Sequence, residues 1–289
     1  MIVCKNCGSK KVVKFGTYKL VQRYWCKTCK RKFKADDSLF HSKVAANNIS
    51  SALTMYYCDE SIDDIRSYLR DVQDYYPSKS VVAHWIRKYA EVAYRKLRSY
   101  RPVVGNKWII NENELTFNRQ KIWIFTVIDI ETEFFLSLRV SESRTSHDLQ
   151  IVLQKAVEFS GKVPLVMATD KLVDLLKDIR FVDYYGRTCT IDKIGRLPPQ
   201  AVRFKDVKED LNQRILRRNF KSVKSLTIFM NRLLIHHNFF SQYDSIKGKT
   251  PAQAAGILYP YRSWADVIRQ PTSKYAELRS HNKIKNHEI

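Results

Sequence analysis

Two pairs of cysteines near the start of the chain constrain its fold more than any other feature. Cys4 and Cys7 form one C-x-x-C, Cys26 and Cys29 form a second, and 18 residues lie between the pairs. A two-residue gap lets both sulfurs of a pair face one ion, so the spacing predicts a four-thiolate zinc site; disulfides are the alternative, which a reducing compartment disfavours. Four thiolates close the coordination shell, so the zinc should be structural. We expect residues 1–38 to form a zinc ribbon.

The chain is strongly basic, with 51 Lys and Arg against 29 Asp and Glu and a formal net charge of +22. Before Asp36 there are eleven basic residues and no acidic one. Such an excess favours a polyanionic partner, and nucleic acid is the leading candidate. No uninterrupted apolar run approaches the roughly 18 residues of a membrane-spanning helix. We expect a cytoplasmic protein with no membrane partner and no small-molecule substrate.

Residues 42–100 are predicted to form a helical domain. A helix over "VAANNISSALTMYY" is followed by one over "SIDDIRSYLRDV", for which Ser61 is a suitable N-cap. Pro77 then breaks the chain, and Ser78 can cap a third helix. A short helix, a turn and a helix that opens with small polar and basic residues are typical of a helix-turn-helix. The expected apolar face of the third helix is Val81, Val82, Trp85, Ile86 and Tyr89. Its expected DNA contacts are Lys79, Ser80, His84, Arg87 and Lys88.

Residues 101–259 show the pattern of a larger α/β domain. Residues 108–117 and the segment "KIWIFTVIDIETEFFLSLRVSES" predict three consecutive strands, the last two joined by a hairpin at "DIETE". An amphipathic helix, "SHDLQIVLQKAVEFSG", and a buried strand, "VPLVMATD", follow. Three antiparallel strands, a helix and a further strand that ends in an acid suggest a ribonuclease H-like core of integrase type. The expected fold class is therefore α/β, with residues 260–289 as a C-terminal tail.

Two motifs at the ends of this domain form a specific pattern. The first is "KWIINENE"; the second is "NFKSVKSLTIFMNRLLIHHNFFSQYDSIKGKTPAQAAGI", in which His237-Asn238-Phe239 precedes the run from Gly248 to Ile257. With the segments between them, they resemble the DDE transposases of bacterial and archaeal insertion sequences, of the small type with a zinc ribbon, a helix-turn-helix and an integrase core. The resemblance covers nearly the whole chain and implies double-stranded DNA as partner and a homodimer. It also implies a chromosome-associated protein of prokaryotic origin, bacterial or archaeal.

The same matching indicates that the acidic triad of these enzymes is degenerate. The first catalytic Asp falls on Asn111, the second falls on Asp170, which is retained, and the third, a Glu, falls on Lys205. The last register rests on Leu211 and Arg214 as the anchor of a Leu-x-x-Arg. Two Mg²⁺ ions about 4 Å apart need several anionic oxygens to offset their repulsion. We therefore expect zinc as cofactor and no Mg²⁺.

Few neighbouring acidic residues could replace the carboxylates expected at Asn111 and Lys205. Glu112 and Glu114 should face away from Asn111, because side chains alternate along a strand. Glu209 lies one helical turn beyond Lys205 on the same face and is the stronger substitute. Even with Glu209 in the site, the first position would remain a neutral amide.

Two functions from different classes compete on these grounds. One is a transposase-derived, domesticated DNA-binding protein without catalytic activity, which binds double-stranded DNA through ribbon, helix-turn-helix and a basic core surface. The other is an active DDE transposase that cuts and joins DNA with a rearranged carboxylate set. Asn111 and Lys205 together favour the first, and an RNA-binding or architectural role stays open. The densest part of the expected basic core surface contains Arg217, Arg218 and Lys221.

Overall fold

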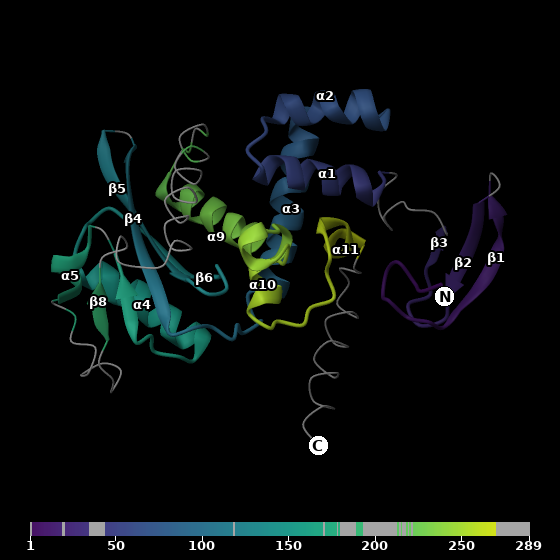
Figure 1. The fold of residues 1–289 in the computed structure, drawn as a ribbon. Coiled ribbons are helices and arrows are strands. Elements are labelled where there is room, and N and C mark those ends of the chain that lie inside the picture. Colours follow the sequence, from purple (N-terminus) through teal and green to yellow (C-terminus); the bar gives the residue numbers. More distant parts are fainter. Residues whose placement is uncertain are drawn as a thin grey trace, which may run out of the picture. The chain divides into compact units, whose positions relative to one another are not determined.

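The computed structural model describes residues 2–18, 21–34, 44–117, 119–169, 171–177, 179, 189–192, 213, 215, 218, 220 and 222–269. The chain divides into two compact units (Figure 1). The first runs to Val92 and includes the residues from Pro260 onward, and the second is Ala93–Tyr259. No helix among the described residues is long and apolar enough to cross a lipid bilayer.

The first unit begins with a small antiparallel sheet, here called the ribbon (residues 2–34). Its strands are β1 (Val12–Tyr18), β2 (Val21–Cys26) and β3 (Lys32–Lys34), in the order β1-β2-β3. Its buried cluster consists of three cysteines and one ring, with three partly buried residues against it: Cys4, Cys7, Cys26 and Phe33, then Val12, Tyr24 and Cys29. A core this small, with four cysteine side chains in it, provides little hydrophobic stabilisation, so we expect the sheet to need a ligand on the thiols to stay folded.

Three helices follow: α1 (Ala46–Tyr57), α2 (Ile62–Gln73) and α3 (Lys79–Leu97). The predicted start of α2 is confirmed, because the Ser61 hydroxyl accepts the backbone N–H of Asp64 at 3.1 Å. The predicted apolar face of α3 is buried except at Val81, which is 36% exposed. The four buried members, Val82, Trp85, Ile86 and Tyr89, follow the i, i+3, i+4, i+7 spacing of one helix face, and Val81 lies outside it.

Part of the segment expected as a C-terminal tail is a helix. Trp264–Arg269 forms α11, which packs against α1 in the same unit. The ring of Trp264, 1% exposed, stacks on that of Tyr57 with centroids 5.6 Å apart. Arg269 also donates a hydrogen bond to the Asn47 side chain at 2.9 Å. Burial of the two rings explains why this segment is packed rather than solvent-exposed.

The second unit is built on a five-stranded mixed sheet in the order β6-β5-β4-β7-β8 (Figure 1). β4, β5 and β6 are antiparallel, whereas β7 and β8 run parallel to β4. This confirms the predicted three antiparallel strands followed by a helix and a further strand, and the sheet resembles a ribonuclease H-like core. The elements are β4 (Lys107–Phe117), β5 (Gln120–Asp129), β6 (Phe135–Ser141), α4 (Ser146–Ser160), β7 (Val166–Ala168), α5 (Val173–Lys177), β8 (Thr190–Asp192), α9 (Val223–Phe240), η2 (Asp244–Ile246) and α10 (Pro251–Ala254).

Helices α4 and α9 cover opposite faces of this sheet. Leu234 of α9 packs into a core cluster with Ile109 of β4 and Ile128 of β5. The side chains of the neighbouring pair, Val127 and Ser137, lie on the opposite face of the sheet. There the Ser137 hydroxyl donates to the Val152 carbonyl of α4 at 2.7 Å. Because strand residues alternate between faces, odd-numbered residues of β4 face α9 and even-numbered ones face α4.

The His-Asn-Phe part of the C-terminal motif attaches α9 to the sheet edge. Asn238 accepts the backbone N–H of Phe135 and donates to its carbonyl, both at 3.0 Å, so one side-chain amide replaces a missing strand neighbour of β6. Nε2 of His237 lies 2.9 Å from the Glu133 carbonyl, and its Nδ1 lies 2.7 Å from the hydroxyl of Tyr243. These contacts give the motif a structural role.

We expect Asn238→Ala to destabilise the second unit by about 2–4 kcal/mol, because it leaves both backbone groups of buried Phe135 without partners. Asn231→Ala is a matched control on the same helix. Among the described residues its half-buried amide donates only to the Thr227 carbonyl, so the change should cost less than about 1 kcal/mol. Urea unfolding curves measure both. Equal losses for the two variants would contradict the clamp role of Asn238.

Candidate zinc site, DNA-binding surface and acidic positions

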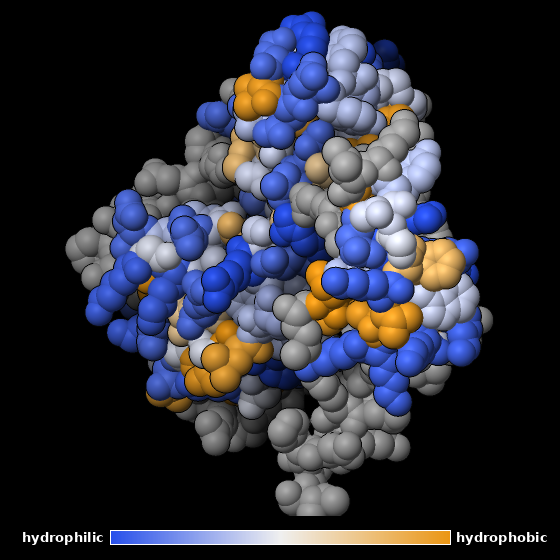
Figure 2. Space-filling model, turned by 90° about the vertical axis from the view of Figure 1, so that its right-hand side faces the viewer, coloured by the Kyte–Doolittle hydropathy of each residue, from blue (hydrophilic) through white to orange (hydrophobic). Residues whose placement is uncertain are grey.

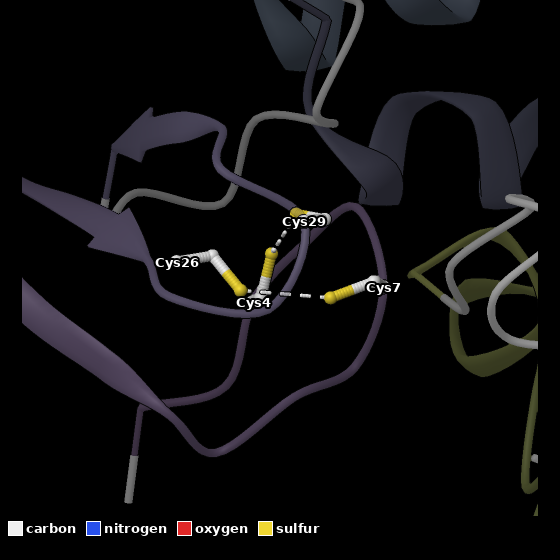
Figure 3. A group of neighbouring side chains, drawn as sticks. All are labelled: Cys4, Cys7, Cys26 and Cys29. Carbon is white, nitrogen blue, oxygen red and sulfur yellow. Dashed lines mark hydrogen bonds between the residues drawn. The ribbon is translucent and has the colours of Figure 1, made fainter.

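The four predicted zinc ligands meet at one point of the ribbon (Figure 3). Their Sγ atoms all lie within 4.8 Å of one another, with 3.6 Å between Cys4 and Cys29 and 3.6 Å between Cys7 and Cys26. Tetrahedral zinc with bonds of about 2.3 Å separates its sulfurs by about 3.8 Å. Donor type, number and spacing therefore fit a closed zinc site, the one such His, Cys or carboxylate cluster within the described part of the chain.

Both cysteine pairs are presented by the same turn. The N–H of Gly8 donates to the Cys4 carbonyl at 2.8 Å, and the N–H of Lys30 donates to the Cys26 carbonyl at 2.9 Å. Gly8 has φ 69° and Lys30 has φ 57°, so each closes its turn in the left-handed region. Glycine adopts this conformation without strain, and a lysine fills the equivalent position in the second pair.

The environment of the thiols differs between the pairs. Burial raises the pKa of Cys4 and of Cys7. Burial acts the same way on Cys26, but the backbone N–H groups of Cys29 and Thr28 and the neighbouring thiols outweigh it and lower the pKa of Cys26 to about 6. A metal takes up thiolates, so its binding must release the protons of the raised pair. Metal affinity should therefore fall as the pH is lowered.

The five predicted contacts of α3 are all exposed, opposite its buried face. Lys79 is already engaged with Asp63, 2.7 Å from Nζ to carboxylate, and this contact holds the pKa of Asp63 below its usual value. An exposed pair of this kind is weak and can be exchanged for a phosphate. On the face drawn in Figure 2, hydrophilic residues cover most of the described surface, and hydrophobic ones form small separate patches. The exposed side of α3 carries Lys79, Arg87 and Lys88, and these cations suit an anionic partner.

The predicted basic core surface is only partly described. The guanidinium of Arg218 lies 4.8 Å from the ring centroid of Phe229 on α9. Arg217 and Lys221 lie outside the described residues. The core contacts to DNA therefore remain predictions.

Asn111 lies on the α9 face of β4, in a rung with Thr126 and Leu138. It is 8% exposed, and the next residue on that face, Asn113, is 3% exposed. Oδ1 of Asn113 is buried with no hydrogen-bond partner among the described residues. This stretch of the central strand thus presents two buried neutral amides, and a buried amide offers a metal ion only a weak carbonyl ligand.

Glu112 and Glu114 lie on the opposite face, as expected from strand alternation. The carboxylate of Glu112, 7% exposed, accepts Nε of Arg144 at 2.6 Å. Nη2 of the same arginine donates to the Lys171 carbonyl at 3.1 Å. Glu114 pairs with Lys121 at the surface at 2.7 Å. Arg144 thereby ties β4 to the segment after β7, and Glu112 is held away from Asn111.

Asp170, Lys205 and Glu209, with the anchor residues Leu211 and Arg214, lie outside the described residues. The structure therefore places only one of the three expected acidic positions, Asn111. The assignment of the other two stays a prediction from the sequence.

Sequence reasoning did not anticipate two buried carboxylates of this unit. Asp129, fully buried, accepts the N–H groups of Gly105 and Thr132 and the Thr132 hydroxyl, and burial raises its pKa. Asp148 accepts hydrogen bonds from the N–H and the hydroxyl of Thr145 in a capping box at the start of α4. It also forms an ion pair with Arg139 at 2.7 Å. Asp129 fixes the β5–β6 turn and Asp148 fixes a helix end, so both are structural. The Thr-x-x-Asp spacing was the available signal for Asp148.

No protein-family model and no curated protein matches the chain. Among solved structures, the magnesium-bound catalytic core domain of HTLV-2 integrase in its trimeric form is 18% identical, over 54% of this chain and 99% of that chain, with a TM-score of 0.39. The simian T-cell lymphotropic virus intasome in complex with PP2A regulatory subunit B56 gamma is 13% identical, over 73% and 75%, with a TM-score of 0.41. The BIV integrase core is 16% identical, over 52% and 93%, with a TM-score of 0.35. These likenesses are distant, and the ribonuclease H-like assignment rests on strand order and helix placement.

Cys7→Ser should abolish zinc binding and unfold the ribbon while the second unit stays folded, because the ribbon's core is largely the thiol cluster. Metal analysis should give one zinc per chain before the change, and limited proteolysis should then cut within residues 2–34. Cys58→Ser, at an exposed thiol after α1, is the control and should retain the zinc. A purified chain with four free ribbon thiols, no zinc and a protease-resistant ribbon would reject the site.

Arg87→Ala should relax sequence preference at one base-pair position and cost about 1–3 kcal/mol on the preferred duplex, if α3 reads base edges. Selection from randomised duplexes measures the preference before and after the change. Arg98→Ala, an exposed arginine just beyond the end of α3, should weaken binding without altering the preference. If variants at Lys79, His84 and Arg87 each lost affinity equally on all sequences, α3 would contact only the DNA backbone.

Proposed function

We propose that this chain is a transposase-derived, domesticated DNA-binding protein that binds double-stranded DNA and does not cut it. The observation that carries the proposal is Asn111, a buried neutral amide on the central strand where the resemblance to DDE transposases expects the first catalytic Asp. In the sequence, Lys205 puts a cation at the position of the expected Glu. These two changes take the site from about three negative charges to roughly none, which opposes two-metal binding.

The acid next to Asn111 is poorly placed to compensate. Glu112 faces α4 and is held by Arg144 at 2.6 Å. Bringing it to the α9 face would require a one-residue slip of β4, which would turn every side chain of that strand to the other face. A central strand paired on both sides opposes such a slip, since β4 forms rungs with β5 and β7 together.

DNA binding is supported by charge and exposure. The chain has a net charge of +22, the ribbon segment has no acidic residue, and the polar side of α3 is exposed and basic. We propose that the four cysteines hold a structural zinc and that α2 and α3 act as a helix-turn-helix, with α3 in the major groove. We further propose a homodimer, which would bind two half-sites, and association with the chromosome.

An active transposase is the competing function, and Asp170 is the residue that favours it, since one acid of the triad is retained. In that case Glu209 would have to supply a second carboxylate. The two functions differ in one observable, the fate of bound DNA in the presence of divalent metal.

The zinc-containing protein should bind duplex DNA in buffers freed of other divalent metals, and should neither nick nor join it when Mg²⁺ or Mn²⁺ is added. Labelled linear and supercoiled DNA resolved on denaturing gels measure this. Binding should weaken with increasing salt, because phosphate neutralisation releases counterions. The double variant Asn111→Asp with Lys205→Glu tests the charge explanation and should raise affinity for Mn²⁺.

Nicking or joining by the unmodified protein, lost in an Asp170→Ala variant, would contradict the inactive assignment and establish the transposase. Absence of duplex binding under all salt conditions would contradict the DNA-binding assignment.

A further inference from the structure

The two faces of the ribbon differ in chemistry. The register places Val13, Trp25 and Lys32 on one rung, with Arg23 opposite Lys34 on the same face. The alternate residues, Tyr24 and Phe33, face the cysteine cluster. We call the first of these the outer ribbon face. Besides Val13, it carries three aromatic and three basic residues: Phe15, Tyr18, Trp25, Arg23, Lys32 and Lys34.

Rings and cations interleave on the outer ribbon face. Nζ of Lys32 lies 4.0 Å from the ring centroid of Phe15, and that ring lies 6.1 Å from the ring of Trp25. The guanidinium carbon of Arg23 lies 5.7 Å from both the Phe15 and the Tyr18 rings. Nζ of Lys34 lies 5.4 Å from the Tyr18 ring. Each exposed ring therefore has a positive charge beside it.

Phe15 and Tyr18 are exposed, so their rings are available to bind a ligand. Phe15 is 38% exposed and Tyr18 is 50% exposed. Exposed cation–π contacts are worth about 0.5–1 kcal/mol each. A nucleic-acid base stacked on an aromatic side chain is worth about 1–3 kcal/mol. A base can therefore displace an ammonium group from a ring, and the freed cation can pair with the adjacent phosphate.

The charge of this face favours an anionic ligand, and its exposed rings favour a nucleic acid whose bases are unpaired. The ribbon has no acidic residue among 2–18 and 21–34, so an anionic ligand meets no repulsion there. In a duplex the faces of the bases are stacked on one another, so they are out of reach of these rings. In a single strand, bases and phosphates alternate, as rings and cations do here.

We propose that the outer ribbon face binds single-stranded DNA, with bases stacked on Phe15, Tyr18 and Trp25 and phosphates paired with Arg23, Lys32 and Lys34. This rests on the proposed function in taking DNA as the partner, and adds a second form of DNA bound at a surface apart from α3. Such a surface would hold a strand that is already unpaired, at a DNA end or a melted site.

The test compares two probes on the full-length, zinc-containing protein: a fluorescent oligo(dT) of about 12 nucleotides and a mixed-sequence duplex hairpin. The double variant Phe15→Leu with Tyr18→Leu removes two rings and keeps the charge. Its affinity for oligo(dT), measured by fluorescence anisotropy, should fall by about tenfold or more, whereas its affinity for the duplex should change by less than about twofold. Retained zinc in the variant shows that the ribbon is still folded.

A matched pair of lysine variants tests the face. Lys32→Gln should weaken oligo(dT) binding more than Lys14→Gln does, because Lys14 pairs with Tyr24 and lies on the other side of the sheet. The proposal is overturned if the unmodified protein does not bind oligo(dT), if the double variant loses both probes equally, or if it loses neither. Tighter binding of oligo(U) RNA than of oligo(dT) would overturn the assignment to DNA. If the unmodified protein did not bind the duplex hairpin, that result would instead contradict the proposed function.

Discussion

The alternation of side chains along β4 is the constraint on which the rest of the second unit depends. This strand is paired with β5 on one side and with β7 on the other, so its register cannot shift without disturbing both neighbours. The register directs Asn111 toward α9 and Glu112 toward α4, where Arg144 holds it. An acid one position away in sequence is therefore on the wrong side of the sheet. If position 111 is that of the first catalytic Asp, as we propose, Glu112 cannot supply the missing carboxylate.

Binding and chemistry place different demands on such a protein. Phosphate binding needs exposed cations in almost any arrangement, whereas a two-metal site needs several carboxylates in one geometry. The first demand is met by the basic ribbon and the exposed side of α3. The second is not met at Asn111, the one described residue at which the resemblance to DDE transposases expects a catalytic carboxylate. A chain of this kind can lose catalysis and keep its affinity for DNA. The sheet can stay intact without a metal, because Arg144 joins β4 to the segment after β7 through an ion pair with Glu112 and a hydrogen bond to the Lys171 carbonyl.

Features with a local or periodic signal were predictable from the sequence. The cysteine spacing predicted the cluster, the Ser61 cap predicted the start of α2, and the strand pattern predicted the order of the second unit's elements. Contacts between distant residues carry no such signal. The Asn238 side chain binds Phe135, 103 positions away. The stacking of Trp264 on Tyr57 holds α11 against α1, in a segment expected from the sequence to be a tail. At Val81 the error was smaller, because an apolar residue beside the buried stripe was counted within it.

We propose that the core holds no catalytic metal, and Mn²⁺ binding to the zinc-containing protein is the direct test. Electron paramagnetic resonance reports free Mn²⁺, whose signal falls when the ion is bound. We expect titration with Mn²⁺ to leave the signal unchanged beyond weak, non-stoichiometric binding, because Asn111 offers only a neutral carbonyl. Tight binding of one or two Mn²⁺ per chain, abolished by Asp170→Ala, would contradict it.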